Sequence, residues 1–186
     1  MADRLAASSV QRVFLTGEPG SGKTTVLTKA AEVLSSRGLR VGGMISNEVR
    51  EEGIRVGFSI QDVRTHQLGT LANVTLSQGP RIGKYTVNLN DLESVGAAGI
   101  RNAIESAEVI LIDEIGPMEL KSIAFVQSVQ AALTSGKHIL GTIHRRASHN
   151  LILEVKSNPQ VAILVVTRQN RDQLPVQIAN RIRSAK

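Results

Sequence analysis

Short apolar runs alternate along the chain with segments in which apolar residues recur every three or four positions. The apolar runs predict buried strands, and the recurring positions predict helices that pack against them. We expect strands at residues 12–16, 39–45, 109–112, 138–143 and 161–167. The last of these runs is almost purely apolar, which is typical of a central strand in a parallel sheet.

Five helices are predicted between and after these strands. They cover residues 23–37, 91–107, 118–135, 147–156 and 170–185. Gly38 and Gly136 follow two of them and are favourable residues at a helix end. Asp91 is expected to cap the second helix, with Glu93 in its first turn, where a negative charge is favoured. Pro175 falls in the early turns of the last helix.

Residues 46–88 break this alternation. Apolar and polar residues alternate over residues 54–63, and with the turn at residues 50–53 they predict a hairpin. Residues 65–79 are polar and lack periodicity, so they are interpreted as a loop, whereas residues 81–88 are a further strand candidate. We therefore expect an α/β fold: a three-layer sandwich with a mostly parallel sheet, helices on both faces and an antiparallel insertion around residues 46–88.

Length and composition are those of one globular domain over residues 1–186, with 41% hydrophobic and 20% charged residues. The chain has no cysteine, which excludes disulfides, thiolate nucleophiles and cysteine-ligated metal sites. No apolar run approaches the roughly 18 residues of a membrane span, and residues 1–11 lack the apolar core of a signal peptide. We expect a cytoplasmic protein without a membrane partner, and we favour a monomer.

The net charge of +6 is concentrated at the C-terminal end of the chain. Residues 1–144 contain as many acidic as basic side chains, whereas residues 145–186 contain eight basic and two acidic ones. Such a segment can bind nucleic acid, or it can be a solvated helix face, which is the interpretation we favour. The chain has only four aromatic residues, fewer than platforms that stack single-stranded bases usually need.

The first motif that carries chemistry follows the first predicted strand. It matches G-x-x-x-x-G-K-[ST] at every fixed position and consists of Gly17, Glu18, Pro19, Gly20, Ser21, Gly22, Lys23 and Thr24. Glycines let the backbone wrap around a phosphate, and the helix that follows directs its positive dipole end at the anion. Lys23 can reach the β- and γ-phosphates, and the Thr24 hydroxyl can ligate Mg²⁺. This P-loop predicts nucleotide binding and a P-loop NTPase fold.

The second motif is an apolar strand that ends in two acids. Its residues are Val109, Ile110, Leu111, Ile112, Asp113 and Glu114. Ligands of open parallel sheets bind at the carboxyl edge, so Asp113 is expected to complete the Mg²⁺ site opposite Thr24. Glu114 can orient or deprotonate a water aimed at the γ-phosphorus. We therefore assign catalytic roles to Lys23 and Glu114, and metal ligation to Thr24 and Asp113.

Together these segments resemble the family of small P-loop nucleoside-triphosphatases that includes thermophile and cancer-related members. The resemblance runs in order through VFLTGEPGSGKTT, VGGMISNEVREEGIRVGF, GPRIGKYTVNLNDLE, VILIDEIGPMEL, ILGTI and VTRQNRDQL. It implies Mg²⁺-dependent hydrolysis of ATP, GTP, CTP and UTP with loose base choice. It also implies nucleotide contacts along the two motifs, which extends the second one to Ile115 and Gly116.

One segment departs from the family pattern. Related sequences often have Thr-Ile-Pro where this chain has Thr142-Ile143-His144, followed by Arg145 and Arg146. The departure puts the shape of this loop in doubt and raises the expectation that its basic residues act in the reaction.

An arginine near the γ-phosphate contributes strongly in other P-loop hydrolases. The candidates are Arg50, Arg55, Arg145, Arg146 and Arg171, each of which can equally be exposed or structural. Arg171 ranks first as a catalytic residue because it follows a strand at the correct edge of the sheet. Glu48 can bind nucleotide or pair with a neighbour, and Glu18 is expected to point into solvent.

Two further groups of residues have ordinary structural interpretations. Lys84 and Tyr85 can touch a base or ribose, although a packed tyrosine is favoured. His144 and His149 lack companions at ligand spacing, so no zinc site is expected.

Hydrolysis of nucleoside triphosphates to diphosphate and phosphate is the leading functional hypothesis. Two alternatives stay open. One is a small-molecule or nucleotide kinase, although residues 64–84 are poor in the arginines of a lid. The other is a nucleotide-gated protein that binds nucleic acid through its basic C-terminal segment.

Overall fold

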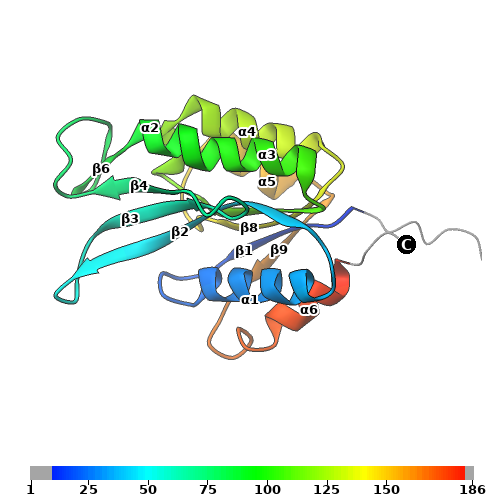
Figure 1. Ribbon diagram of the computed structural model, residues 1–186. Helices are drawn as coiled ribbons and strands as arrows, with labels where there is room; N and C mark the ends of the chain where they lie inside the picture. Colours follow the sequence, from blue (N-terminus) through cyan, green and yellow to red (C-terminus); the bar gives the residue numbers. More distant parts are fainter. Residues whose placement is uncertain (1–9, 183–186) are drawn as a thin grey trace, which may run out of the picture.

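Nine strands form one mixed sheet in the computed structural model, which describes residues 10–182 (Figure 1). The strand order across the sheet is β5-β6-β4-β3-β2-β7-β8-β1-β9. The strands are β1 (Arg12–Thr16), β2 (Val41–Glu51), β3 (Ile54–Asp62), β4 (Leu68–Asn73), β5 (Arg81–Ile82), β6 (Tyr85–Val87), β7 (Val109–Ile115), β8 (His138–Ile143) and β9 (Val161–Val165). Strands β2, β7, β8, β1 and β9 pair in parallel, and β2 to β6 pair antiparallel.

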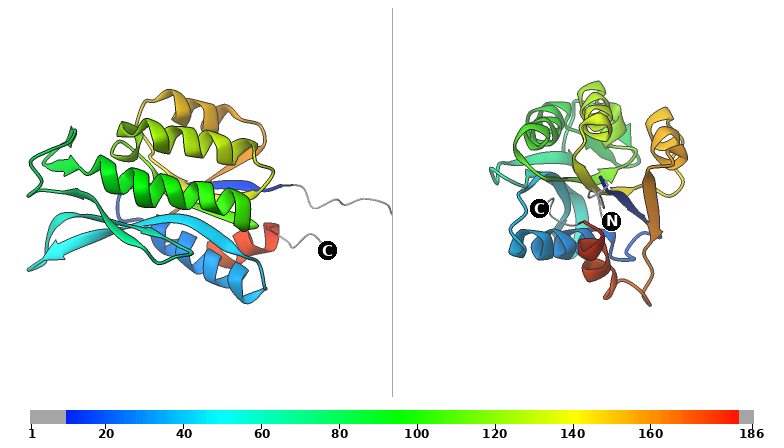
Figure 2. Two further views of the ribbon diagram at one scale, coloured as in Figure 1. Left: turned by 45° about the horizontal axis from the view of Figure 1, so that its top comes forward. Right: turned by 90° about the vertical axis from the view of Figure 1, so that its right-hand side faces the viewer.

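Helices cover both faces of this sheet, which confirms the predicted α/β sandwich and its antiparallel insertion. Figure 2 shows α1 (Lys23–Ser36) and α6 (Leu174–Arg181) on one face. On the other face lie α2 (Leu89–Asp91), α3 (Ala98–Ser106), α4 (Ile123–Thr134) and α5 (Asn150–Ser157). A π-helical segment, Leu92–Ala97, connects α2 to α3 without a break.

Strand β1 shows how the sheet separates two hydrophobic cores. Successive side chains of a strand point to opposite faces. Val13 and Leu15 therefore pack with the helices α1 and α6, whereas Phe14 packs on the other face with α3, α4 and α5. All three side chains are fully buried. This burial on both faces explains the uninterrupted apolar run in the sequence and fixes the position of the loop that follows β1.

Two strand predictions were wrong. Residues 68–73, expected to be a loop, form β4 between β3 and β6, and its residues Leu71 and Ala72 are buried. Backbone hydrogen bonds to β3 and β6 on its two sides stabilise this strand, although its local sequence does not predict one. The run at residues 161–167 forms an edge strand instead of a central one, because β9 pairs only with β1 within residues 10–182. Its last residue, Val165, is 56% exposed.

Several helix boundaries also differ from the prediction. Asn88 caps the helix that begins at Leu89, and its Oδ1 accepts a hydrogen bond from the Asp91 amide at 3.2 Å. Asp91 instead accepts one from the Thr70 amide at 2.7 Å, so this acid links the helix to β4. The helix predicted from residue 118 begins at Ile123, after a short 3-10 turn. The α5 helix begins at Asn150, three residues later than expected.

The C-terminal helix is shorter than predicted within the described residues. It begins at Leu174, with Pro175 in its first turn, and ends at Arg181. Residues 183–186 and the first nine residues lie outside the described part, so the expectations for the far end of the helix and for a signal peptide concern residues that the structure does not describe.

The strand predicted at 81–88 is split into β5 and β6 by a turn at Gly83. Between residues 10 and 182, no helix combines the length and apolarity of a membrane span.

Candidate functional site

The loop between β1 and α1 depends on glycine at three positions. Gly17, Gly20 and Gly22 have φ angles of 153°, 74° and 99°, in the region that other residues rarely adopt. A Cβ atom at Gly17 would lie 2.6 Å from the carbonyl oxygen of Val166, so no side chain fits there. The tight turn is therefore specific to this glycine pattern and directs the chain into the first turn of α1.

The N-terminus of α1 is open to an anion. Gly22 occupies the N-cap and has no side chain to accept from the first amides, and the first turn contains no acidic residue. The amides of a helix start carry partial positive charge, which favours a bound phosphate. The loop brings Lys23 to the same place, where its Nζ lies 3.5 Å from the carbonyl oxygen of Gly17.

Buried polar atoms without partners mark the same edge of the sheet. Among the described residues, Thr16 Oγ1, Ser21 Oγ and Asp113 Oδ2 are buried and make no hydrogen bond. Buried polar groups in proteins are nearly always paired, so unpaired ones at a single edge indicate where a ligand binds. Ser21 and Asp113 belong to the two predicted motifs, and Thr16 is the last residue of β1, directly before the first motif.

Asp113 is held in one orientation by a threonine of the neighbouring strand. Thr142 Oγ1 donates to Asp113 Oδ1 at 2.5 Å, and Asp113 is only 2% exposed. Burial raises the pKa of Asp113 above its ordinary value, while the hydroxyls of Thr142 and Thr24 and the charge of Lys23 act in the opposite direction. A free carboxylate oxygen near the Thr24 hydroxyl is the kind of hard oxygen pair that Mg²⁺ prefers, so these residues fit the ion.

Glu114 follows Asp113 and reaches the cavity in front of the loop. Burial raises its pKa to about 7, the negative charge of Asp113 acts in the same direction, and Lys23 opposes both. A carboxylate with a pKa near neutrality can accept and release a proton at physiological pH. Its position and its pKa therefore agree with the role of a base for water.

Glu119 is a second buried acid that the sequence analysis did not single out. It lies in the 3-10 turn after β7 and is 5% exposed. A Cβ atom at Gly116 would lie 3.1 Å from Glu119 Oε2 and 3.3 Å from Glu114 Oε2, so both carboxylates flank this glycine. Burial, with Glu114 and Asp113 nearby, raises the pKa of Glu119 to about 8. The only sequence signal is an acid five residues after Glu114.

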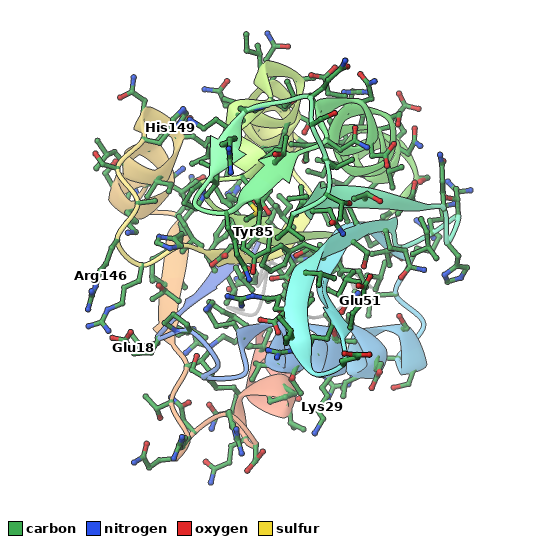
Figure 3. All side chains as sticks on the ribbon, turned by 90° about the vertical axis from the view of Figure 1, so that its left-hand side faces the viewer. Glu18, Lys29, Glu51, Tyr85, Arg146 and His149 are labelled. Atoms are coloured by element: carbon green, nitrogen blue, oxygen red, sulfur yellow. The ribbon has the colours of Figure 1, made fainter. Side chains whose placement is uncertain are left out.

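A cavity of about 800 Å³ joins these residues. One wall is the glycine-rich loop with Lys23 and Thr24, and another is the end of β7 with Asp113 and Glu114. The hairpin β2–β3 and the loop after β8 close the remaining sides, with Ser46, Asn47, Glu48, Arg55, Phe58, His144, Arg145 and Arg146. Figure 3 looks onto this edge, where Glu18 and Arg146 lie on the same side.

A second cavity of about 400 Å³ lies along the same loop, toward the end of β9. It is lined by residues 16–21, 165–168 and Arg145. The two cavities share Gly17, Glu18, Pro19, Gly20 and Arg145. A ligand held by the loop thus has open space on two sides.

The second predicted motif contributes mainly through its two acids. Residues 109–112 are buried within the sheet, and Ile115 is also fully buried. Of residues 109–116, only Asp113 and Glu114 line the larger cavity. The remaining strand residues position these two carboxylates by packing in the core.

The candidate arginines separate into two groups. Arg50 and Arg55 both bind the Glu48 carboxylate, and Arg55 also donates to the Tyr85 hydroxyl at 3.0 Å. These contacts lower the pKa of Glu48, with Arg50 as the largest cause. Arg55 lines the larger cavity, but Arg50 lines neither cavity. Glu48 therefore pairs with neighbouring side chains, which was one of its two predicted roles, and it also lines the larger cavity.

Arg145 and Arg171 lie on different sides of the loop. Glu18 is exposed, as expected, and it forms an ion pair with Arg145. Arg171 lies against the loop, where a Cβ atom at Gly22 would be 3.5 Å from its Cδ. Its side chain is 46% exposed and lines neither cavity.

The remaining sequence candidates are structural. Tyr85 is 7% exposed and packs edge-to-face with Phe58, and the Lys84 ammonium lies 5.4 Å from the Tyr85 ring centre. Nδ1 of His144 and Nδ1 of His149 accept from nearby backbone amides. Residues 10–182 contain no group of three side chains able to hold a metal through His, Cys, Asp or Glu alone.

Comparisons with known proteins agree with this geometry. A nucleoside-triphosphatase THEP1 of Thermofilum pendens is 49% identical over 95% of this chain and 97% of its own length. A cancer-related nucleoside-triphosphatase homolog of Mus musculus is 40% identical over 95% and 98%.

Two solved structures have the same fold. The crystal structure of THEP1 from Aquifex aeolicus has a TM-score of 0.84 at 29% identity, covering 94% of this chain and all of that one. The solution structure of a human cancer-related nucleoside triphosphatase has a TM-score of 0.80 at 38% identity, covering 95% and 100%. The model of the NTPase family matches residues 12–179, and the chain therefore belongs to the NTPase family.

Proposed function

We propose that this protein hydrolyses nucleoside 5′-triphosphates to diphosphate and phosphate in a Mg²⁺-dependent reaction. The observation that carries the proposal is the unpaired Oδ2 of Asp113, which is buried beside Thr24 and Lys23 at the carboxyl edge of the sheet. A structural carboxylate would be fully paired, whereas a magnesium ligand keeps one oxygen for the ion. Membership of the NTPase family supports the same reaction.

The phosphate chain is bound by the glycine-rich loop. Amides from Gly20 to Thr24 and the ammonium of Lys23 stabilise the negative charge that grows on the phosphate oxygens in the transition state. Thr24 and Asp113 would hold magnesium, which would supply positive charge that neutralises the phosphates. The buried Thr142 hydroxyl keeps Asp113 in the orientation that leaves its second oxygen free.

Glu114 acts as the base in this proposal. It accepts a proton from water as the water oxygen bonds to the γ-phosphorus, and the bond to the oxygen that bridges the β- and γ-phosphorus atoms breaks. The diphosphate leaves with that oxygen, and the γ-phosphoryl group becomes inorganic phosphate. Glu119 is buried, and its carboxylate lies beside that of Glu114 at Gly116, so we assign it the role of a positioning residue.

Broad base tolerance is part of the proposal, and its support is indirect. The relatives are named for nucleoside triphosphates as a class. All chemical roles assigned above act on the triphosphate, which ATP, GTP, CTP and UTP share. Arg171, which lies beside Gly22, is retained as a candidate for contact with the phosphates from the α1 side.

The decisive experiment measures phosphate release from ATP, GTP, CTP and UTP, with and without Mg²⁺, on wild type and Lys23→Ala. We expect release from all four nucleotides, dependence on Mg²⁺ and loss of activity in the variant. Calorimetry that detects no binding of any nucleotide with Mg²⁺ would refute the proposal.

Phosphoryl transfer to a small acceptor is the second candidate function. The observation that favours it is the extension of the cavity past Glu114 onto the hairpin, where Ser46, Asn47 and Phe58 line it. An acceptor hydroxyl in this part of the cavity would take the place of water. Phosphate release without any added acceptor distinguishes hydrolysis from transfer.

Binding of nucleic acid through the C-terminal segment has less support. Several of its basic residues have internal partners, because Arg145 and Arg146 pair with Glu18 and Lys156 donates to the carbonyl oxygen of Arg145. Steeply salt-dependent binding to nucleic acid would favour this function, and an absence of binding at low salt would exclude it.

A further inference from the structure

The loop after β8 is anchored to the sheet and to α5. The amide of His144 donates to the carbonyl oxygen of Ile115 at 3.0 Å, which fixes the start of the loop on β7. Lys156 Nζ donates to the carbonyl oxygens of Arg145 at 3.0 Å and His144 at 3.4 Å. Nδ1 of His144 accepts from the amide of Ala147 at 2.9 Å. The backbone of Arg145 is thus held from two elements.

From this backbone, the side chain of Arg145 crosses to the phosphate-binding loop. It forms an ion pair with Glu18, and the guanidinium of Arg146 lies 3.9 Å from the same carboxylate. Glu18 and Arg145 line both cavities, so their ion pair lies where the two cavities meet. Arg171, in contrast, lines neither cavity.

An ion pair at this position is weak compared with the contact that a nucleotide offers. The two side chains are 52% and 59% exposed, and ion pairs between exposed side chains contribute little to stability. A guanidinium binds phosphate oxygens through charge-assisted, often bidentate hydrogen bonds, which are stronger. A triphosphate in the loop also repels the Glu18 carboxylate. Transfer of the arginine from Glu18 to phosphate is therefore favourable.

We propose that Arg145 is a catalytic arginine that Glu18 holds in the free protein and that moves to the phosphate oxygens when a nucleoside triphosphate binds. The inference rests on the proposed hydrolysis and deepens it, because it names the residue that stabilises charge on the transferred group. Glu18 supplies a resting partner, which keeps the guanidinium beside the site in the absence of nucleotide.

The alternative role for Arg145 is to neutralise Glu18 and nothing more. The two roles separate in a double-mutant cycle of wild type, Glu18→Gln, Arg145→Ala and the double variant. If Arg145 contacts phosphate, Arg145→Ala lowers kcat by about tenfold or more, both in the wild-type protein and in the Glu18→Gln variant. If it only neutralises Glu18, the loss disappears in the Glu18→Gln variant, and that result would overturn the proposal. Unchanged kcat in the single variant would overturn it as well.

A binding measurement makes the test independent of turnover. We expect Arg145→Ala to weaken binding of ADP with aluminium fluoride and Mg²⁺ by about tenfold or more, and to leave binding of ADP with Mg²⁺ alone nearly unchanged. Equal effects on both ligands would contradict transfer to the γ-phosphate position. Arg101→Ala, which removes an exposed arginine of α3, is the matched control for charge, and thermal unfolding checks that each variant is folded.

The failure of this inference and that of the proposed function give different results. A wild-type protein that binds no nucleotide refutes the proposed function. A wild-type protein that hydrolyses nucleotides, with an Arg145→Ala variant of equal kcat and equal affinity for the fluoride complex, refutes the inference alone.

Discussion

Thr142 Oγ1 donates a 2.5 Å hydrogen bond to Asp113 Oδ1 and leaves Asp113 Oδ2 buried without a partner. The two residues lie on neighbouring parallel strands, β8 and β7. One oxygen of the carboxylate is used to fix its orientation, and the other is available to a ligand. This division of roles resembles the outer-shell hydrogen bonds that orient metal ligands in proteins.

We expect Thr142→Val to lower the apparent affinity for Mg²⁺ in the activity assay by about 10- to 100-fold, because the carboxylate loses its fixed orientation. Titration of Mg²⁺ at saturating nucleotide measures the change. Thr142→Ser retains the hydroxyl and is the control that should stay close to wild type. Equal Mg²⁺ affinity in the valine and serine variants would contradict the positioning role.

Glu114→Gln tests the base. The amide has the same shape but cannot accept a proton, so kcat should fall by roughly 10²–10⁴. Nucleotide affinity, measured by calorimetry with Mg²⁺, should be retained because the phosphate-binding loop is intact. A variant with wild-type turnover would remove Glu114 from the mechanism.

The buried Glu119 predicts a pH dependence of stability. Its folded-state pKa of about 8 lies above the ordinary value of 4.5, so between these values the folded protein holds a proton that the unfolded chain releases. The unfolded state then binds fewer protons, and the free energy of unfolding decreases as pH rises through this window. The decrease in the free energy of unfolding caused by Glu119 is complete above pH 8.

Glu119→Gln mimics the protonated acid at every pH, so the variant should gain stability relative to wild type between pH 5 and pH 8. Urea unfolding at both pH values measures the difference. Glu114 is present in both proteins, so its own titration largely cancels. A stability difference that does not change with pH would contradict the raised pKa of Glu119.

Gly17→Ala should reduce nucleotide binding more than Gly20→Ala. Both positions have positive φ angles, which cost about 1–2 kcal/mol for a residue with a side chain. At Gly17 the added Cβ also meets the Val166 carbonyl oxygen at 2.6 Å, whereas at Gly20 nothing lies within 4 Å. Calorimetric affinities for a triphosphate with Mg²⁺ compare the two variants, and an equal loss would show that the contact with Val166 is unimportant.

Arg171→Ala tests the arginine that the sequence ranked first. If Arg171 contacts the phosphates from the α1 side, kcat should fall by about tenfold or more. Steady-state kinetics beside Arg145→Ala determine which arginine matters. Unaltered turnover in Arg171→Ala would remove this residue from the catalytic set.

Local sequence determined the elements whose conformation depends on residues that are close together in the chain. The glycine spacing from Gly17 to Gly22 defines a turn that only glycine can adopt, and the apolar run before Asp113 defines a strand buried on both faces. Chain order then brings both ends to one edge of a parallel sheet. The glycine-rich loop and the place of Asp113 at the same edge of the sheet were therefore predictable.

Tertiary structure decided everything that depends on distant neighbours. Strand β9 is as apolar as a central strand, yet it lies at the edge because nothing in a run of aliphatic residues specifies the order of strands. The pairing of Thr142 with Asp113, the burial of Glu119 and the ion pair between Glu18 and Arg145 join residues that share no local pattern. Such contacts arise only when packing brings the elements together, because desolvation and charge act through space and not along the chain.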